Sequence, residues 1–183
     1  MLRIISGRWR QHRLNLPPPS ITRPTTDRVR ESLFNILVHG YGLDFNGLTV
    51  LDVFSGSGAL GLEALSRGAQ SVHFLENNPH VLKVLKANIE SLKATDGCHI
   101  LKGDKMSAAP CAVDLVFLDP PYHQNLAVPM CIALQEKGWL KPETLICLET
   151  SSHDVPALIP SLICDQQRQY GQSVISFWRL KEG

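Results

Sequence analysis

The fold prediction rests first on residues 48–61, LTVLDVFSGSGALG. The first half of this stretch is apolar and β-branched, which is typical of a strand buried on both faces of a sheet. The second half spaces Gly56, Gly58 and Gly61 as G-x-G-x-x-G and leads into an apolar helical pattern. Glycines at such a strand-to-helix turn let a nucleotide-bearing ligand approach the backbone. Taken alone, the spacing also fits glycines that serve only tight packing of the helix on the strand.

Strand and helix patterns alternate from residue 48 onward. Strands are predicted near residues 49–53, 71–75, 98–102, 113–118 and 144–149, and helices near residues 59–67, 79–93 and 125–137. This alternation predicts an α/β fold with a parallel sheet and helices on both faces. Residues 162–169 and 173–180 break the alternation, because they are two strand patterns joined by a tight turn. They predict an antiparallel hairpin at one edge of the sheet.

The first thirty residues are strongly basic. They hold seven arginines and one acid, Asp27, for a net charge of +6, whereas the remaining residues sum to −5. Arginine binds phosphate through a bidentate fork and stacks on bases, so this arm is suited to a polyanion. A flexible, solvated tail is the alternative interpretation. The candidate arginines for binding a polyanion are Arg3, Arg8, Arg10, Arg13 and Arg23.

The sequence of the arm also predicts local secondary structure. Residues 2–5 and 12–14 flank Ser6-Gly7 and predict a short hairpin. We expect residues 1–22 to form a basic extension and residues 23–183 the main domain. The main domain opens with a helix that Thr25 or Thr26 caps and Gly40 ends; its apolar stripe is Val29, Leu33, Ile36 and Leu37.

Residues 119–122, DPPY, follow the buried strand pattern at 113–118. Two prolines cannot continue a strand, because they lack N–H donors and fix φ. The carboxylate of Asp119 is therefore predicted at the carboxyl edge of the sheet, beside exposed carbonyl groups and the ring of Tyr122. Hydrogen-bond acceptors next to a stacking surface suit a planar group that carries an amine. The alternative is an ordinary turn that ends a strand.

Two carboxylates accompany the glycine loop as candidate ligand contacts. Glu76 ends the second predicted strand, where such folds hold the hydroxyls of a ribose. Asp52 precedes the glycines, where it would repel a pyrophosphate but could pair with an ammonium group. This combination favours S-adenosylmethionine over NAD. Asp104 could reach the adenine amine, although a turn aspartate is nearly as good an interpretation. The candidate cofactor contacts are Asp52, Ser55, Gly56, Gly58, Glu76, Asn77, Asp104 and Lys105.

Composition narrows the class of protein further. A chain of 183 residues is about one domain. Its five cysteines are scattered, which is typical of reduced thiols in a cytoplasmic protein. The seven histidines show no ligand spacing, so no metal site is predicted. No apolar run reaches the length of a membrane span, and the N-terminus lacks the pattern of a secretory signal.

The glycine loop, the acidic strand end and DPPY, in this order, resemble the class I methyltransferases that act on amino nitrogens. Residues 3–7, RIISG, and 23–37, RPTTDRVRESLFNIL, resemble the RsmD family of bacterial 16S rRNA guanine-N2 methyltransferases. The resemblance covers nearly the whole chain. It implies a Rossmann-like, mostly parallel seven-stranded sheet with an antiparallel C-terminal hairpin and a basic N-terminal β-hairpin extension. It also implies S-adenosylmethionine as cofactor and an assembled or assembling small ribosomal subunit as partner. Separately, we expect the protein to be monomeric.

In this interpretation Asp119 and the Pro120 carbonyl accept the hydrogens of the target amine. Pro121 completes the rigid turn, and Tyr122 stacks on the base. DPPY would also suit methylation of adenine or cytosine amines in DNA, although no separate DNA-recognition domain is evident. A non-catalytic RNA-binding assembly factor is a further alternative, and an NAD oxidoreductase is a distant one, because the chain is short for it.

Overall fold

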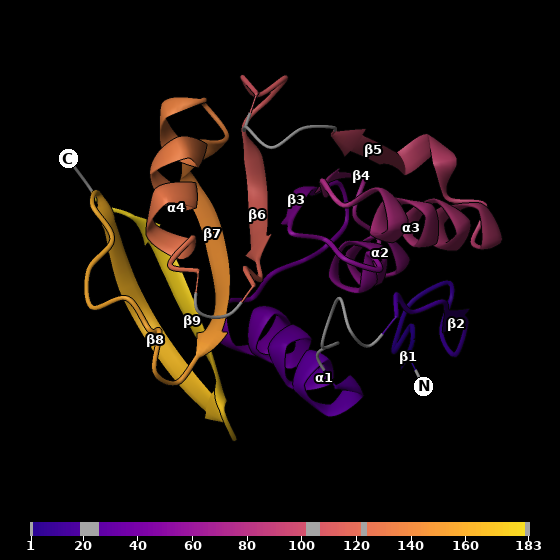
Figure 1. The fold of residues 1–183 in the computed structure, drawn as a ribbon, viewed down its shortest axis with the longest axis horizontal. Helices are drawn as coiled ribbons and strands as arrows, with labels where there is room; N and C mark the ends of the chain where they lie inside the picture. The colour runs from indigo at the N-terminus through magenta and orange to yellow at the C-terminus, as the bar shows by residue number, and fades with distance from the viewer. Residues whose placement is uncertain (1, 19–25, 102–106, 122–123, 182–183) are drawn as a thin grey trace. The chain divides into compact units, whose positions relative to one another are not determined.

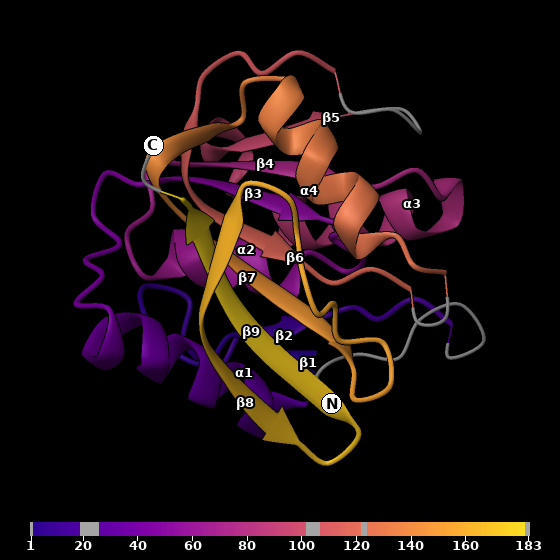
Figure 2. The same cartoon turned by 90° about the vertical axis from the view of Figure 1, so that its left-hand side faces the viewer.

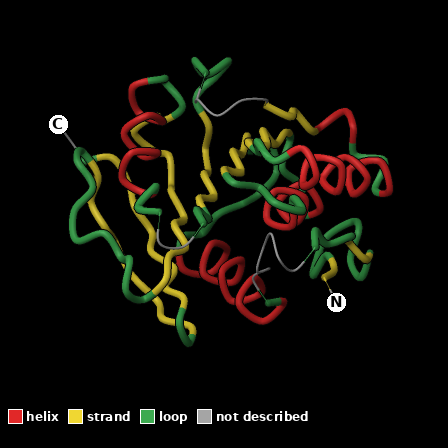
Figure 3. Tube along the Cα trace, in the orientation of Figure 1, coloured by secondary structure: helices red, strands yellow, loops and turns green. Residues whose placement is uncertain are grey.

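The computed structural model describes residues 2–18, 26–101, 107–121 and 124–181. The chain forms two compact units, Met1–Lys102 and Gly103–Gly183 (Figure 1). Both units combine helices with strands (Figure 3). The fold class is as predicted. Among the described residues it is an α/β fold with a mostly parallel seven-stranded sheet and antiparallel strands at its C-terminal end. The expected domain boundary after residue 22 stays a prediction.

The N-terminal arm forms the predicted hairpin in the first unit. Its strands β1 (Leu2–Arg3) and β2 (Arg13–Leu14) pair antiparallel. The hairpin is extended by a hydrogen bond of 2.9 Å from the Ile4 N–H to the His12 carbonyl. Leu2, Ile4 and Leu14 are buried, so the arm has an apolar face of its own.

The helix after the arm is α1 (Asp27–Asn35), which continues as a π-helical segment, η1 (Ile36–Gly40). Thr26 caps α1, since its hydroxyl accepts the Val29 N–H at 3.4 Å. The predicted cap and end are therefore confirmed, while the wider π turn was not expected. Leu33, Phe34 and Leu37 are buried, so the apolar stripe faces the core.

The parallel strands of the first unit follow the predicted ranges closely. The unit contains β3 (Thr49–Val53), α2 (Ala59–Ser66), β4 (Ser71–Leu75), α3 (Pro79–Ser91), η2 (Thr95–Gly97) and β5 (Cys98–Leu101). The strand order is β5-β4-β3, all parallel. Helix α2 packs against β3 and β4, and α3 turns Val81, Leu85 and Ile89 towards the core.

The second unit contains β6 (Val113–Leu118), α4 (Ala127–Glu136), β7 (Leu140–Ser151), β8 (Leu162–Tyr170) and β9 (Ser173–Leu180). Strand β7 is parallel to β6 and antiparallel to β9, and β8 lies outermost beside β9 (Figure 2). The predicted C-terminal hairpin is thus confirmed. Its turn needs Gly171, whose φ of +61° is a conformation that favours glycine.

Strand β7 is twice as long as the pattern suggests. It was expected over residues 144–149 but begins at Leu140, with a register shift against β6 between Val113 and Leu115. The Thr144 hydroxyl secures the irregular part. It accepts the Lys141 N–H at 2.9 Å and donates to the Val113 carbonyl at 2.6 Å. Residues 141–143 are a lysine, a proline and a glutamate, which are not typical of a buried strand, so the sequence pattern does not predict this half of β7.

Candidate functional site

The glycine loop lies between β3 and α2, and its glycines do different work. Gly56 and Gly58 both have positive φ, +56° and +80°. A Cβ on Gly58 would lie 2.4 Å from Leu85 Cδ1, and one on Gly61 would lie 2.5 Å from Phe74 Cε1. A Cβ on Gly56 would meet nothing closer than the Phe54 carbonyl oxygen at 3.9 Å. Gly58 and Gly61 therefore serve packing, whereas the space above Gly56 is open to a ligand.

Glu76 follows β4 and ties the loop to that strand. Its carboxylate accepts backbone N–H groups from Gly56 at 3.1 Å and from Asn77 and Asn78, each at 2.9 Å. A carboxylate has about four acceptor positions, so capacity remains for a further donor. The predicted ribose contact stays a prediction. The structure adds a role that the sequence did not suggest, because Glu76 holds the glycine loop in place.

Asp52 is buried on β3, where it caps helix α2. Its Oδ2 accepts the Gly61 N–H at 2.9 Å. Burial raises the pKa of Asp52 from 3.8 to about 8, the bond from Gly61 opposes that rise, and the charge of Glu76 adds to it. The expected pairing with an ammonium group stays a prediction.

The hydroxyl of Ser55 indicates whether the glycine loop could bind the expected cofactor. Its hydroxyl is buried and forms no hydrogen bond within the described part of the chain. A buried hydroxyl left unpaired costs about 1–3 kcal/mol, so a ligand that pairs with it would recover this free energy. The Ser55 hydroxyl, the open face of Gly56 and the Glu76 carboxylate together suit a polar nucleoside with an amino-acid side. Asp104 and Lys105 lie outside the described residues.

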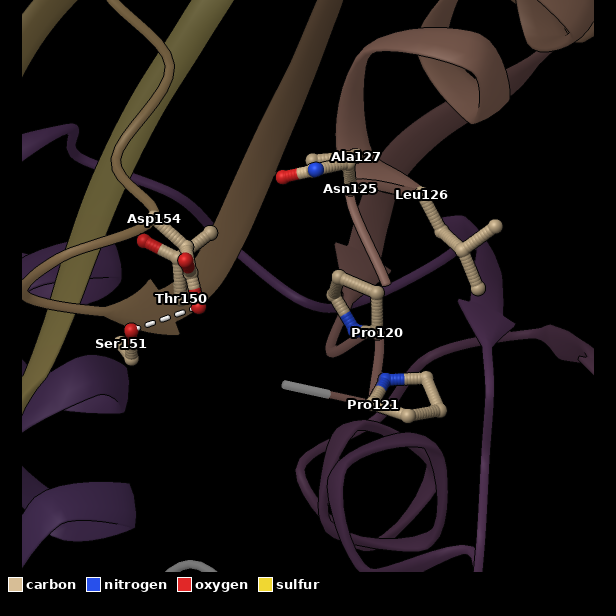
Figure 4. A pocket seen from close by; sticks show the side chains of 8 residues that line it. All are labelled: Pro120, Pro121, Asn125, Leu126, Ala127, Thr150, Ser151 and Asp154. Atoms are coloured by element: carbon tan, nitrogen blue, oxygen red, sulfur yellow. Dashed lines mark hydrogen bonds between the residues drawn. The ribbon is translucent and has the colours of Figure 1, made fainter. Parts of the chain in front are cut away.

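The end of β6, in the second unit, carries the other group of predicted site residues. The strand stops at Leu118, Asp119 follows half-buried, and Pro120 is buried where the chain leaves the sheet. The predicted break after the strand is confirmed, while Tyr122 lies outside the described residues. A hollow that opens to solvent adjoins this turn, and the free space in it, open solvent included, amounts to about 250 Å³ (Figure 4). It is lined by Pro120, Pro121, Asn125, Leu126, Ala127, Thr150, Ser151 and Asp154.

Sequence reasoning missed the wall of this hollow that comes from the end of β7. Thr150 and Ser151 are the last residues of that strand, and Asp154 lies in the turn that follows. A polar run at the carboxyl end of a parallel strand was the available signal, since ligands in α/β folds bind at that edge.

The arm arginines fall into two groups. Arg8, Arg10 and Arg13 are exposed, and the Arg8 guanidinium lies 3.9 Å from the ring centroid of Trp9. Arg3 instead donates to Asp27 at 3.1 Å and to Gln11 at 2.7 Å. Part of the positive charge is therefore neutralised within the protein. Arg23 lies outside the described residues.

The described ranges contain neither a cluster of metal ligands nor a membrane-spanning helix. No group of three or more His, Cys, Asp or Glu side chains there could hold a metal ion. None of the helices in those ranges combines the length and the apolar character needed to span a bilayer.

Known proteins are similar to this chain in fold and in sequence. The family described as conserved hypothetical protein 95 matches residues 2–179. The ribosomal RNA small subunit methyltransferase D of Haemophilus influenzae is 41% identical, over 87% of this chain and 83% of that protein. A solved structure from Escherichia coli, assigned as a methyltransferase, has a TM-score of 0.82 at 31% identity and covers 98% of each chain. An RNA methyltransferase from Salinibacter ruber, solved with S-adenosyl-L-homocysteine, has a TM-score of 0.66 at 18% identity over 88% of this chain and 95% of that one.

The fold is that of a class I methyltransferase, with a glycine loop after the first parallel strand and an Asp-Pro-Pro turn after the fourth. Within that class, the chain belongs to the ribosomal RNA small subunit methyltransferase D family. The predicted cofactor is confirmed at the level of the family, which uses S-adenosylmethionine as its methyl donor.

Proposed function

We propose that this protein methylates the exocyclic N2 of a guanine in 16S rRNA of the bacterial small ribosomal subunit. The observation that carries the proposal is the turn after β6, where Asp119 and the Pro120 carbonyl end a buried strand beside a hollow. Membership of the family supports rRNA as the substrate. Ribosomes place the reaction in the cytoplasm, and we expect the protein to act as a monomer.

The Ser55 hydroxyl, the Gly56 backbone and the Glu76 carboxylate are the groups we assign to the cofactor. S-adenosylmethionine supplies an electrophilic methyl group on a sulfonium. The chain contributes orientation, because the Glu76 carboxylate, itself held by the N–H groups of Asn77 and Asn78, accepts the Gly56 N–H of the loop. Loop geometry of this kind lowers the entropic part of a transfer barrier.

The target amine is a poor nucleophile, because its lone pair is delocalised into the guanine ring. When the Asp119 carboxylate and the Pro120 carbonyl each accept one N–H, the nitrogen is drawn towards a tetrahedral geometry and its lone pair becomes available. In the transfer a C–S bond breaks and a C–N bond forms, and Asp119 is positioned to take the proton that the nitrogen sheds. Fixed acceptors of this kind account for a large share of catalysis in many enzymes.

The arm is proposed to hold the RNA. Arg8, Arg10 and Arg13 are exposed on a hairpin that is fixed to the first unit, so they form a preorganised set of phosphate ligands. Contacts of this type orient a nucleic acid without reading its sequence.

The test is to map methylated guanines in 16S rRNA from cells with and without the protein, and to incubate the pure protein with labelled S-adenosylmethionine. Small subunits, free 16S rRNA and DNA serve as parallel substrates. We expect one N2-methylguanine to disappear in the deletion strain and label to enter the small-subunit RNA. Label in DNA alone would indicate a DNA amino-methyltransferase. Failure to bind the cofactor would favour a non-catalytic assembly factor.

A further inference from the structure

The hollow beside the Asp-Pro-Pro turn has a polar side and a mostly apolar side, where the amide of Asn125 lies next to Ala127 (Figure 4). Pro120, Leu126 and Ala127 form the apolar side, while Thr150 and Asp154 lie across from the two prolines (Figure 4). The polar wall is built by the end of β7 and its following turn. The polar groups of this wall take no part in the methyl transfer described above, because that step needs only acceptors for the hydrogens of the amine.

Thr150 carries a buried hydroxyl with an unmet hydrogen bond. The residue is 3% exposed, and its Oγ1 finds no hydrogen-bond partner in the described residues. Because Thr150 lines the hollow, a ligand placed there is the natural partner. An unpaired buried group destabilises a fold, so its presence calls for an explanation, and a ligand that pairs with it is one.

Asp154 is held in place by its neighbour. The Ser151 hydroxyl donates to Asp154 Oδ2 at 2.7 Å, and the Asp154 N–H donates to the Ser151 carbonyl at 3.0 Å. The oxygens of an ionised carboxylate only accept hydrogen bonds. The polar wall therefore offers a fixed acceptor at Asp154 and a hydroxyl at Thr150 that can donate.

These two groups match the edge of guanine and not that of adenine or cytosine. Next to its amine, guanine carries N1–H, a donor, and then O6, an acceptor. Adenine and cytosine carry an unprotonated ring nitrogen next to the amine, and a carboxylate repels that lone pair. A site that pairs with a substrate N–H rejects an analogue lacking it, because a buried polar group is then left unpaired.

We propose that Thr150 and Asp154 are the specificity-determining residues for the base. With the amine at Asp119 and Pro120, the Asp154 carboxylate accepts the guanine N1–H and the Thr150 hydroxyl donates to O6. This inference rests on the proposed function. The inference accounts for the choice of base, which the Asp-Pro-Pro turn cannot make, since that turn alone would accept any exocyclic amine.

The test compares two target bases in small subunits reconstituted with 16S rRNA that carries guanine or 2-aminopurine at the mapped position. 2-Aminopurine keeps the N2 amine but has no N1–H and no O6. The wild-type protein should prefer guanine by about 100- to 1,000-fold in kcat/KM, because 2-aminopurine lacks both the N1–H bonded to the charged Asp154, worth about 10- to 100-fold, and the O6 bonded to Thr150, worth about 10-fold. In Asp154→Asn this preference should fall to about 10-fold, the share contributed by the Thr150 bond to O6, because an amide can present either a donor or an acceptor to N1.

The matched control is Asp165→Asn, which makes the same chemical change at an exposed ion pair with Arg179 on β8 and β9. The control should keep the wild-type preference. If Asp154→Asn lowers both rates equally, or leaves their ratio unchanged, the assignment of Asp154 is wrong.

Thr150→Val separates recognition from folding. Valine has the same shape without the unpaired hydroxyl, so the melting temperature should stay the same or rise. Methylation of guanine should nevertheless fall about 10-fold, while methylation of 2-aminopurine, which has no O6, should not change. Unchanged activity on guanine would exclude a role for the Thr150 hydroxyl.

Failure of the proposed function gives a different result. If the wild-type protein methylates no guanine in any RNA, the proposed reaction is wrong and so is the recognition built on it. If it methylates guanine N2 and the variants leave the preference intact, only the recognition by Thr150 and Asp154 is wrong.

Discussion

Asp119 is half-buried at the end of β6, directly before the two prolines that force the chain out of the sheet. Its carboxylate is presented by rigid backbone on one side and by a buried strand on the other. An acceptor held in this way loses little entropy when the substrate arrives, which is the physical basis of its assigned role.

Replacement of Asp119 by alanine should leave binding of S-adenosylmethionine unchanged and lower turnover by roughly 10²-fold or more, the scale for removal of one preorganised polar group. Calorimetry measures the cofactor affinity, and incorporation of labelled methyl into small subunits measures turnover. Near-normal methylation by this variant is the result that contradicts the acceptor role. Asp165→Asn serves again as the control.

Asp52 differs from Asp119 because it is fully enclosed. Its folded-state pKa of about 8 lies above the unfolded value of 3.8, so the folded protein holds this proton more tightly. The stability that follows is fully present below about pH 4 and is lost as the pH rises towards 8. The loss amounts to at most roughly 1.4 kcal/mol per pH unit.

Asp52→Asn should therefore remove part of the pH dependence of stability. The melting temperature of the variant, relative to wild type, should rise steadily between pH 5 and pH 8, because the amide cannot ionise. Differential scanning calorimetry across this range measures the effect, with the exposed Asp96→Asn as control. Parallel profiles for wild type and Asp52→Asn would show that burial of this carboxyl does not govern the slope.

The N-terminal arm is a fixed part of the first unit rather than a flexible tail. The buried Glu63 carboxylate on α2 accepts the Ile5 N–H at 2.7 Å and the Ser6 N–H at 3.0 Å. The Ser66 hydroxyl donates to the Ser6 carbonyl at 2.6 Å. A Cβ on Gly7 would lie 1.9 Å from the Ser66 carbonyl oxygen, so only glycine allows this approach.

A second attachment connects the arm to the glycine loop. The Asn88 amide on α3 accepts the Asn15 N–H at 2.8 Å and donates to the Asn15 carbonyl at 3.1 Å. The same side chain donates to the Ser57 carbonyl at 2.9 Å. One buried amide thus joins the proposed RNA-binding segment to the loop assigned to the cofactor.

Glu63→Gln should loosen the arm without unfolding the sheet. The amide turns an N–H₂ group towards backbone N–H donors and no longer balances Arg67, which donates to Glu63 at 2.8 Å. The expected local cost is about 1–3 kcal/mol. Hydrogen exchange of residues 2–14 should speed up while β3 and β4 stay protected. The exposed Glu90→Gln is the control, and unchanged exchange in the arm would contradict its attachment through Glu63.

Charge is distributed unevenly over the chain as a whole. The net charge of +1 combines a basic arm with an acidic remainder. Asp27 pairs with Arg3 and with the buried Arg30, whereas the exposed Arg8, Arg10 and Arg13 carry the charge that we propose binds RNA. This arrangement predicts RNA binding that depends on salt.

Substitution of Arg8, Arg10 and Arg13 together by glutamine should weaken RNA binding and flatten its dependence on salt. The slope of log affinity against log salt should become shallower by about 0.7 to 0.9 for each phosphate that the protein no longer neutralises. The control replaces Lys83, Lys86 and Lys137, also exposed, by glutamine, which removes the same net charge elsewhere. Equal effects from both triple variants would mean that net charge, and not the arm, controls binding.

Local sequence patterns were sufficient for most of the regular structure. Strands β3, β4 and β6 begin and end where their apolar runs predict, because buried parallel strands are apolar throughout and are ended by glycine, proline or an acid. The exception is β7, whose first half includes the exposed Pro142 and Glu143. Its register depends on the Thr144 hydroxyl reaching Val113, which no local pattern reveals.

The candidate site followed from sequence only in part. The glycine spacing, Glu76 and the Asp-Pro-Pro turn are short motifs whose chemistry is visible in the residues themselves. The attachment of the arm by Glu63 joins residues that are 57 and 58 positions apart, and that by Asn88 spans 73 positions. The hollow likewise joins Pro120 to Thr150 and Asp154. Whether a polar group is buried depends on the residues that pack against it, and these come from distant parts of the chain. Only the tertiary structure therefore decides which hydroxyls and carboxylates have hydrogen-bond partners within the protein and which remain available to a ligand.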